Sequence, residues 1–223
     1  MLIAEIGNCH DGTIEDFKKT VRIAYECGAD AVKGQAFDPR SIVGSMPYEF
    51  YKERAFSLEQ YMELIDYGAR IGIPVFFSIF SEKFAALKVR QTFQKFAGGQ
   101  TISHWKQIEA SDYPNVIVSI KEFAMLPRLK YSKILHVSKY LTDIPHLEQI
   151  EFLSEYYGRQ VGYSDHTVGI FHTERAIKDY GAHVIEKHFT LTRDISHGGH
   201  QFRDAVHAAD PQELEQIAKI LRG

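Results

Sequence analysis

Residues 161–190 read VGYSDHTVGIFHTERAIKDYGAHVIEKHFT and contain one complete strand–helix–strand unit. The β-branched and aromatic run at 161–166 is typical of a buried strand, and the amphipathic stretch at 171–180 is typical of a covering helix. Gly181 then supplies the left-handed residue with which many helices end. A second apolar run at 184–190 follows at once. Two strands joined through a helix in this way are expected to lie parallel in one sheet.

The same unit recurs along the whole chain of 223 residues. Strands are predicted at 2–7, 31–36, 74–80, 94–98, 115–120, 133–139, 161–166 and 184–190. Helices are predicted at 13–27, 58–71, 82–89, 146–157, 171–180 and 211–221. Glycines follow several of these helices, as at Gly28, Gly72 and Gly158. The repetition predicts an α/β fold, a compact (β/α)₈ TIM barrel that forms a single domain over residues 1–223.

Two features qualify this prediction. The chain is shorter than the ~250 residues typical of such barrels, and the segment 121–132, which contains Pro127, has room for only a short helix. We therefore expect a shortened connection after strand five. An open doubly wound sheet is the rival architecture, because periodicity alone does not distinguish it from a closed barrel. No GxGxxG or GxxxxGK[ST] motif follows the first strand, which disfavours the nucleotide-binding form of that rival.

Composition narrows the classes of function. The net charge is -3 and no long Lys/Arg run is present, so we expect no nucleic-acid partner. The chain has neither a signal-peptide pattern at its start nor a stretch of ~20 apolar residues, and we expect a cytoplasmic protein without a membrane partner. The two cysteines, Cys9 and Cys27, are expected to be reduced thiols; a reactive role for Cys9 is the less favoured alternative.

Polar residues gather at the carboxyl ends of the predicted strands, where barrels place their functional groups. They are Glu5, Asn8, His10, Lys33, Gln35, Lys95, Ser164, His166, Glu186 and His188. Side chains alternate along a strand, so Lys33 with Gln35, Ser164 with His166, and Glu186 with His188 are each expected to share the inward face. The intervening Asp165 and Lys187 should point toward the helices, and we interpret them as structural ion-pair or hydrogen-bond partners.

Two kinds of chemistry fit these positions. His166 and His188 end adjacent strands and could share a divalent metal, although two hydrogen-bonded core histidines are the alternative. Lys33 and Lys95 occupy inward positions where a lysine is costly unless paired, which indicates an anionic ligand such as phosphate or carboxylate. Pairing with Glu5 or Glu186, or Schiff-base chemistry by either lysine, are the alternatives there.

Four segments resemble, in order and spacing, the signature segments of the N-acetylneuraminate (sialic acid) synthase family. They are IAEIGNCHDG at 3–12, GADAVKGQAF at 28–37, GYSDHTVGI at 162–170 and VIEKHFT at 184–190. The resemblance spans nearly the whole chain. It implies a transferase of carbohydrate biosynthesis that condenses phosphoenolpyruvate with an N-acetylmannosamine-like amino sugar. The products would be a sialic-acid-type 2-keto acid and phosphate, and the cofactor would be Mn²⁺ or Mg²⁺.

The resemblance also implies roles for individual residues. His166 and His188 would be the metal ligands, and Lys33, Lys95 and Ser164 would contact phosphoenolpyruvate. Gln35 would contact the sugar. Glu5 or Glu186 would handle protons or orient metal-bound water.

The chain departs from the family on the phosphate side. FSIFS at 77–81 replaces a segment commonly like FSTPF, so Ile79 stands where a hydroxyl would touch phosphate. KFAGGQ at 95–100 replaces KIGSGE, which puts Gly98 in place of a phosphate-binding serine. LHVSKYLT at 135–142 replaces LHCTNIYP, and Lys139 stands where an asparagine is usual. We expect Lys139 to compensate as a cation for the lost neutral donors.

The acceptor side departs as well. Gln100 replaces a glutamate that contacts the sugar, and the tyrosine of the sixth-strand segment is either lost to Leu141 or shifted to Tyr140. GGHQFRD at 198–204 stands where PDHKFS is common, which removes a sugar-binding aspartate. The family's usual C-terminal antifreeze-like domain is not found in these residues, so we expect a homodimer or a partner chain that supplies it. A divergent relative with another acceptor or reaction, or a noncatalytic binding or assembly subunit, are the alternative functions.

Overall fold

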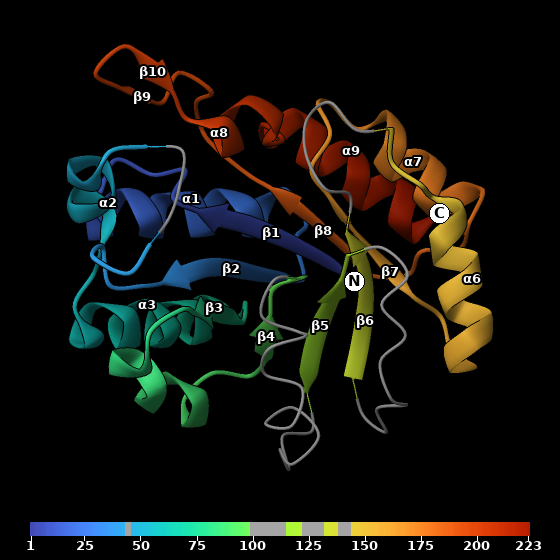
Figure 1. Cartoon of the computed structure of the whole chain (residues 1–223), viewed down its shortest axis with the longest axis horizontal. Coiled ribbons are helices and arrows are strands. Elements are labelled where there is room, and N and C mark those ends of the chain that lie inside the picture. The colour runs from blue at the N-terminus through green and yellow to red at the C-terminus, as the bar shows by residue number, and fades with distance from the viewer. Residues whose placement is uncertain (43–45, 99–114, 122–131, 138–143) are drawn as a thin grey trace.

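The computed structural model describes residues 1–42, 46–98, 115–121, 132–137 and 144–223. Eight parallel strands close into a barrel in chain order, as predicted (Figure 1). Each strand pairs with the next one, and β8 pairs back with β1. The strands are β1 (Leu2–Gly7), β2 (Ala31–Ala36), β3 (Val75–Ile79), β4 (Gln94–Phe96), β5 (Val116–Ile120), β6 (Ser132–Val137), β7 (Gly162–Asp165) and β8 (Ile185–His188).

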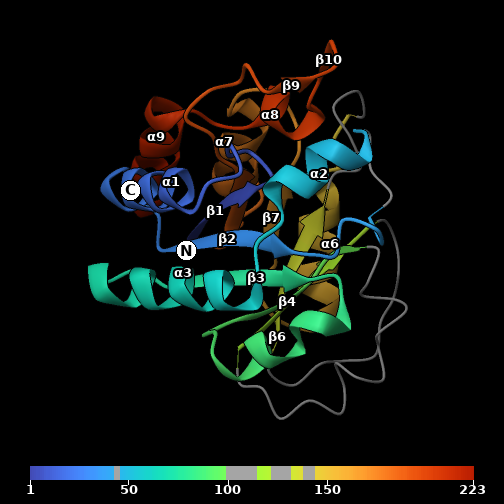
Figure 2. The same ribbon diagram turned by 90° about the vertical axis from the view of Figure 1, so that its left-hand side faces the viewer.

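Helices surround this barrel. They are α1 (Ile14–Glu26), α2 (Tyr48–Arg54), α3 (Leu58–Ile71), the 3₁₀ helix η1 (Glu82–Val89), α6 (Glu148–Tyr157), α7 (Phe171–Lys178), α8 (Arg203–His207) and α9 (Pro211–Arg222). A small antiparallel hairpin, β9 (Ser196–His197) with β10 (His200–Gln201), precedes α8. Helices α1, α3 and α9 pack against β1, β2 and β3 on one side of the barrel (Figure 2).

Local sequence explains where the longest helices begin and end. Helix α3 begins with a capping box, in which Ser57 and Gln60 exchange side-chain-to-backbone hydrogen bonds. It ends at Gly72, whose φ of 89° is the left-handed conformation that glycine adopts without steric cost. Helix α9 has the same box from Asp210 and Glu213, followed by a proline at its first turn. These caps confirm the helix–glycine–strand rhythm of the sequence.

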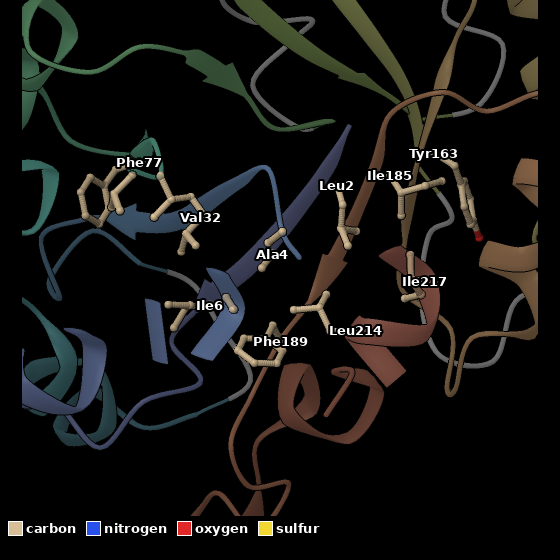
Figure 3. Close-up of a cluster of buried hydrophobic side chains, with 14 of the residues drawn as sticks. Leu2, Ala4, Ile6, Val32, Phe77, Tyr163, Ile185, Phe189, Leu214 and Ile217 are labelled. Atoms are coloured by element: carbon tan, nitrogen blue, oxygen red, sulfur yellow. The ribbon is translucent and has the colours of Figure 1, made fainter. Parts of the chain in front are cut away.

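The main hydrophobic core lies between the strands and the helices. Leu2, Ala4 and Ile6 are fully buried on the outer face of β1, and Figure 3 shows them in one cluster with Val32 of β2 and Leu214 of α9. Burial of each large aliphatic side chain contributes roughly 1.5–3 kcal/mol. This outer layer therefore holds the helices on the barrel.

The barrel interior is divided into an apolar and a polar layer. Ile3, Phe76, Ile117 and Leu135 belong to one buried cluster, and the first three lie near the amino ends of their strands. Two residues further along, β1, β3 and β5 carry Glu5, Ser78 and Ser119, which are also buried. The period of two that places the apolar residues inside therefore also turns these polar side chains into the barrel. The polar layer lies at the carboxyl ends, where barrel enzymes have their sites.

Gly162 opens the GYSDHT segment because of a close approach between strands. A Cβ atom at this position would lie 2.2 Å from the Val184 carbonyl oxygen and 2.6 Å from Leu135. Any side chain would therefore push β7 away from β8. The glycine lets the two strands that carry Ser164 and Glu186 lie in close contact.

Some predicted elements differ from the structure at their ends or in type. The segment 82–89 is a 3₁₀ helix with a kink at Phe84. The predicted strand 94–98 ends at Phe96, and 184–190 is a strand only over Ile185–His188. Helices α2 and α8 and the β9–β10 hairpin were not predicted. The expected shortened connection after strand five lies mostly outside the described residues. Within the described ranges, no helix has the length and apolar character needed to cross a membrane.

Candidate active site

A cavity of about 160 Å³ lies at the carboxyl ends of the barrel strands. Its lining includes the three same-face pairs that strand alternation predicts: Lys33 with Gln35, Ser164 with His166, and Glu186 with His188. Glu5 and Lys95 line it too. Ten residues were predicted to act in catalysis, substrate binding or metal binding, and eight of them line this one cavity. The other two, Gln100 and Lys139, lie outside the described residues.

Charged side chains inside the cavity form a buried network. Lys33 Nζ lies 2.5 Å from Glu5 Oε2 and 3.2 Å from Glu186 Oε2. Lys95 Nζ donates to Glu186 Oε2 over 2.9 Å and to Ser119 Oγ over 2.7 Å. Each of the two lysines is therefore paired with a glutamate. Such pairing was one of the alternatives to an anionic ligand in the sequence analysis.

Glu186 is the centre of this network. Its carboxylate faces both lysines and accepts a 2.9 Å hydrogen bond from Ser164 Oγ. Burial opposes its ionisation, but the Lys33 and Lys95 charges outweigh burial and hold the pKa of Glu186 well below its ordinary value. Burial also lowers the pKa of Lys33, to about 8, although the Glu186 charge opposes that shift. The Glu186 carboxylate thus bridges two buried ammonium groups inside the cavity.

Three histidines meet beside the network. The ring centroids of His166 and His188 are 5.2 Å apart. The ring centroid of His207 lies 5.3 Å from that of His166 and 4.9 Å from that of His188. One nitrogen from each ring lies within 4.8 Å of the others. Burial lowers the pKa of His166 to about 4 and that of His207 to about 3, and it lowers the pKa of His188 well below its ordinary value. All three are therefore neutral imidazoles at neutral pH, the form that binds metals.

The hydrogen bonds of this cluster fit a metal better than a satisfied core. His188 Nδ1 and both ring nitrogens of His207 are buried and make no hydrogen bond of normal geometry among the described residues, although the Arg203 backbone interacts with the His207 ring. Buried nitrogens of this kind are uncommon in native proteins and call for a ligand or ion. His166 Nε2 is 3.4 Å from Ser164 Oγ. The cluster is thus the part of the described chain that suits a divalent metal.

His207 was missed in the sequence. It lies on α8, beyond the last predicted strand, so the alternation that selected the other residues did not extend to it. The signal was weak, because α8 has only five residues.

His10, in contrast, lies apart from this cluster. It stacks on Phe56 with ring centroids 5.1 Å apart, and Phe17 contacts its edge.

Lys121 is a second residue that sequence analysis did not select. It follows β5 and lines the cavity together with Lys33 and Lys95. A Cβ atom on Gly98 would lie 2.8 Å from Lys121 Cγ, so the lysine side chain lies against the glycine. The cation therefore occupies space next to the position where the resembling family has a phosphate-binding serine. Its signal in the sequence was its position directly after a predicted strand.

A second cavity, of about 300 Å³, adjoins the first and shares Gln35 and Phe80 with it. Asn8 Nδ2 donates to Gln35 Oε1 over 2.9 Å on its wall. Asp204, from α8, lines the same cavity, and burial raises the pKa of its carboxyl to about 6. The segment 198–204 was expected to lack the family's aspartate, yet it brings this carboxylate to the barrel mouth.

The residues between the inward pairs are structural, as predicted. Lys187 Nζ lies 3.1 Å from Asp165 Oδ2 and donates to the Thr167 carbonyl oxygen over 2.5 Å. Thr173 Oγ1 donates to the same Asp165 oxygen over 2.6 Å. Both charged side chains are fully buried. This pair fixes the β7–β8 edge from the helix side. Cys9 and Cys27 are free thiols, also as expected.

Comparison with known proteins places these features in a family. The NeuB family model matches residues 132–223. An uncharacterized protein of Methanocaldococcus jannaschii is 30% identical over 99% of this chain and 69% of its own length. An N,N'-diacetyllegionaminic acid synthase of Legionella pneumophila is 26% identical over 99% of this chain and 71% of its own length.

Solved structures share the fold. The N-acetylneuraminic acid (sialic acid) synthetase of Leptospira borgpetersenii superposes with a TM-score of 0.83. It is 24% identical, and the match covers 99% of this chain and 82% of the synthetase. A truncated 3-deoxy-D-arabino-heptulosonate 7-phosphate synthase of Thermotoga maritima has a TM-score of 0.68 at 11% identity, covering 100% of this chain and 85% of that one. These likenesses support the closed barrel.

Proposed function

This chain belongs to the NeuB family, and from that premise we propose that it condenses phosphoenolpyruvate with an amino sugar to form a sialic-acid-type 2-keto acid and phosphate. Relatives named as legionaminic, pseudaminic and N-acetylneuraminate-9-phosphate synthases support the reaction class. The observation that carries the proposal is the cavity in which Lys33, Lys95 and Lys121 adjoin the histidine cluster. Cations for an anionic substrate and ligands for a metal thus share one space.

Phosphoenolpyruvate carries a phosphate and a carboxylate, and the lysines provide a partner for each. Lys33 and Lys95 approach Glu186 from β2 and β4, and Ser164 donates to the same carboxylate. We assign these donors to the substrate anions, with Lys121 in place of the lost neutral phosphate donors. Lys139, the cation first expected in that role, stays a prediction. The ion pairs favour anion binding over Schiff-base chemistry, which requires an uncharged amine.

The bond changes balance with one water molecule. C3 of phosphoenolpyruvate attacks the aldehyde carbon of the open-chain sugar, and a proton is delivered to the aldehyde oxygen. Water adds at C2 and loses one proton, which balances the proton taken up by the aldehyde oxygen. The bond between C2 and the phosphate oxygen then breaks as the new C2 hydroxyl becomes the ketone, and the second proton of the water leaves with the phosphate. Glu5 lies next to the histidine cluster, since its Oε1 and the His188 ring are both within 3.4 Å of a Cβ built on Gly7. It is therefore placed to accept or deliver these protons.

A divalent ion at His166 and His188, Mn²⁺ or Mg²⁺, supplies Lewis-acid polarisation for the aldehyde when it is bound. Gln35, Asn8 and Asp204 line the adjoining cavity and are assigned to the sugar hydroxyl and amide groups. The two cavities meet at Gln35, which positions the acceptor against the anion site. The acceptor wall thus uses a carboxylate from α8.

The test is calorimetric binding of phosphoenolpyruvate with and without Mn²⁺, followed by phosphate release with a panel of N-acyl hexosamines. We expect metal-dependent binding, release of one phosphate per sugar consumed, and a 2-keto acid identified by mass spectrometry. Lys95→Met should abolish binding, whereas Lys178→Met, on the exposed face of α7, should not. Binding without turnover on any acceptor would indicate another reaction, and no binding would indicate a noncatalytic subunit.

A further inference from the structure

We propose that His207 is a third imidazole ligand of the metal assigned to His166 and His188, and that this site selects a first-row transition ion over Mg²⁺. The inference rests on the proposed function only for the presence of a metal at this place. The two-histidine site was predicted from strands β7 and β8. The third ligand comes from a separate element, α8, and nothing in the strand pattern requires it.

Backbone hydrogen bonds hold His207 next to His188. The Ala209 amide donates to the His188 carbonyl oxygen over 2.7 Å, and the Ala209 carbonyl accepts from the Thr190 amide over 3.0 Å. A parallel bridge between Phe189 and Ala209 results, so the chain after α8 runs beside the end of β8. Figure 1 shows α8 near the end of β8, at the side toward which β1 points. His207 is therefore placed by main-chain bonds that do not depend on its own side chain.

The distances allow one ion to contact all three rings. The three ligand nitrogens lie no more than 4.8 Å from one another, so a metal ion placed centrally would be within about 2.8 Å of each nitrogen. A metal–nitrogen bond is about 2.0–2.1 Å long. Each nitrogen therefore needs to move by less than about 1 Å to bind the ion. Small rotations of the rings are enough. His207 is 4% exposed, and neither of its ring nitrogens makes a hydrogen bond of normal geometry in the described part of the chain. The Arg203 backbone on the same helix interacts with this ring, which leaves the other ring nitrogen for the cluster.

Three imidazoles change which ion is preferred. Mg²⁺ requires near-ideal octahedral oxygen coordination and retains its waters, whereas imidazole nitrogen suits first-row transition ions. Each nitrogen ligand therefore shifts the site away from Mg²⁺. Glu5 and Glu186 do not restore an oxygen-rich site, because both are paired with Lys33. The geometry thus selects a transition ion and leaves three of six octahedral positions for water and substrate oxygen.

The experiment uses Co²⁺ as the probe with the full chain stripped of metal. Visible absorption titration gives the affinity, and X-ray absorption at the cobalt edge counts the imidazole ligands. We expect one tightly bound Co²⁺ with three imidazoles, and we expect excess Mg²⁺ to leave the spectrum unchanged. Two imidazoles in the wild-type protein, or displacement by Mg²⁺, would overturn the proposal. The wild-type count needs no variant, so it does not depend on whether a substitution folds.

Variants at His207 add a second comparison. His207→Gln and His207→Ala should each reduce the number of imidazole ligands on Co²⁺ to two. Each should also weaken Co²⁺ binding by about 100-fold or more, which exceeds the usual loss for a residue that only hydrogen-bonds to a metal ligand. Near-ultraviolet circular dichroism checks that each variant is folded. His200→Ala is the matched control, because His200 is exposed and pairs across the hairpin with His197, a competing two-histidine site. Loss of binding in His200→Ala instead would refute the assignment.

These measurements separate the metal assignment from the reaction. They use neither phosphoenolpyruvate nor sugar, so a protein that binds Co²⁺ through three imidazoles but releases no phosphate keeps this inference and loses the proposed function. A protein that turns over with a two-imidazole metal does the reverse.

Discussion

Lys95 on β4 donates a 2.9 Å hydrogen bond to Glu186 on β8, and these strands lie on opposite sides of the eight-stranded barrel. The pair therefore spans the interior, 91 residues apart in sequence. Lys33 reaches the same carboxylate from β2. Glu186 thus faces two buried lysines, of which Lys33 also pairs with Glu5 and Lys95 has no second glutamate among the described contacts.

The substitution Glu186→Gln should destabilise the protein by about 3 kcal/mol or more, because it leaves Lys95 buried without a negative partner. The measurement is the free energy of unfolding from urea titration at neutral pH. The double variant Lys95→Met with Glu186→Leu should recover much of the loss, since it removes both charges and leaves Lys33 paired with Glu5. A single variant as stable as the wild type would contradict this view of the network.

Phosphoenolpyruvate affinity should fall as the pH rises from about 7 to about 9.5. Burial lowers the pKa of Lys33 to about 8, so its ammonium is present below that pH and lost above it. An anion binds the charged form, and affinity is therefore greatest on the acidic side of this range. Calorimetric dissociation constants at several pH values measure the effect. In Lys33→Arg the decline should be much smaller; an equal decline would assign the titration to another group.

Lys121→Met should weaken phosphoenolpyruvate binding by about 10-fold or more, as expected for the loss of a charge-assisted hydrogen bond to phosphate. Lys121→Arg should retain most of the affinity. Gly98→Ala should act in the same direction as Lys121→Met, because its Cβ would lie 2.8 Å from Lys121 Cγ and displace the side chain. Lys178→Met on α7 serves as the control. Unchanged affinity in Lys121→Met would remove this residue from the anion site.

Asp204→Asn should raise the KM for the amino sugar by about 10-fold and change phosphoenolpyruvate affinity by much less, because Asp204 lines the adjoining cavity and acts on the anion cavity only through its charge on Lys33. Burial raises the pKa of the Asp204 carboxyl to about 6. Sugar binding through the carboxylate should therefore strengthen as the pH rises through about 6, and this dependence should disappear in the variant. Initial rates at saturating phosphoenolpyruvate provide both values. A parallel loss of affinity for both substrates would contradict the separation of the cavities.

The parallel sheet and its inner pairs could be predicted because they follow regular periods. Helix–glycine–strand units predict parallel strands covered by helices, and the period of two turns Lys33, Ser164 and Glu186 inward. Closure of the sheet into a barrel is a property that periodicity alone does not distinguish from an open sheet. His207 and Asp204 could not be found in this way. They lie on a helix of five residues after a short hairpin, and neither element has enough residues to establish a period. Their positions depend on the Phe189–Ala209 bridge, a contact between segments that local sequence does not specify.

Lys121 shows a second reason why some site residues could not be predicted from the sequence. A lysine directly after a strand is usually a solvated end of that strand, and only the packing of its side chain over Gly98 indicates another role. Likewise, alternation placed Glu186 inside the barrel but could not tell whether it or an external anion would be the partner of the lysines. Such choices depend on distances between strands that are far apart in the chain.

Glu186 occupies the hydrogen-bond donors that a substrate anion would use. Its carboxylate is bound to two ammonium groups and a serine hydroxyl, which are the same donors that a substrate carboxylate or phosphate needs. Under the proposed function, Glu186 is an internal competitor for the substrate anion, and binding is an exchange of one anion for another. Small monovalent anions would gain little from such an exchange. A ligand with two anionic groups at the right separation would gain at both lysines, so the proposed site would discriminate by the number of charges before it recognises a sugar.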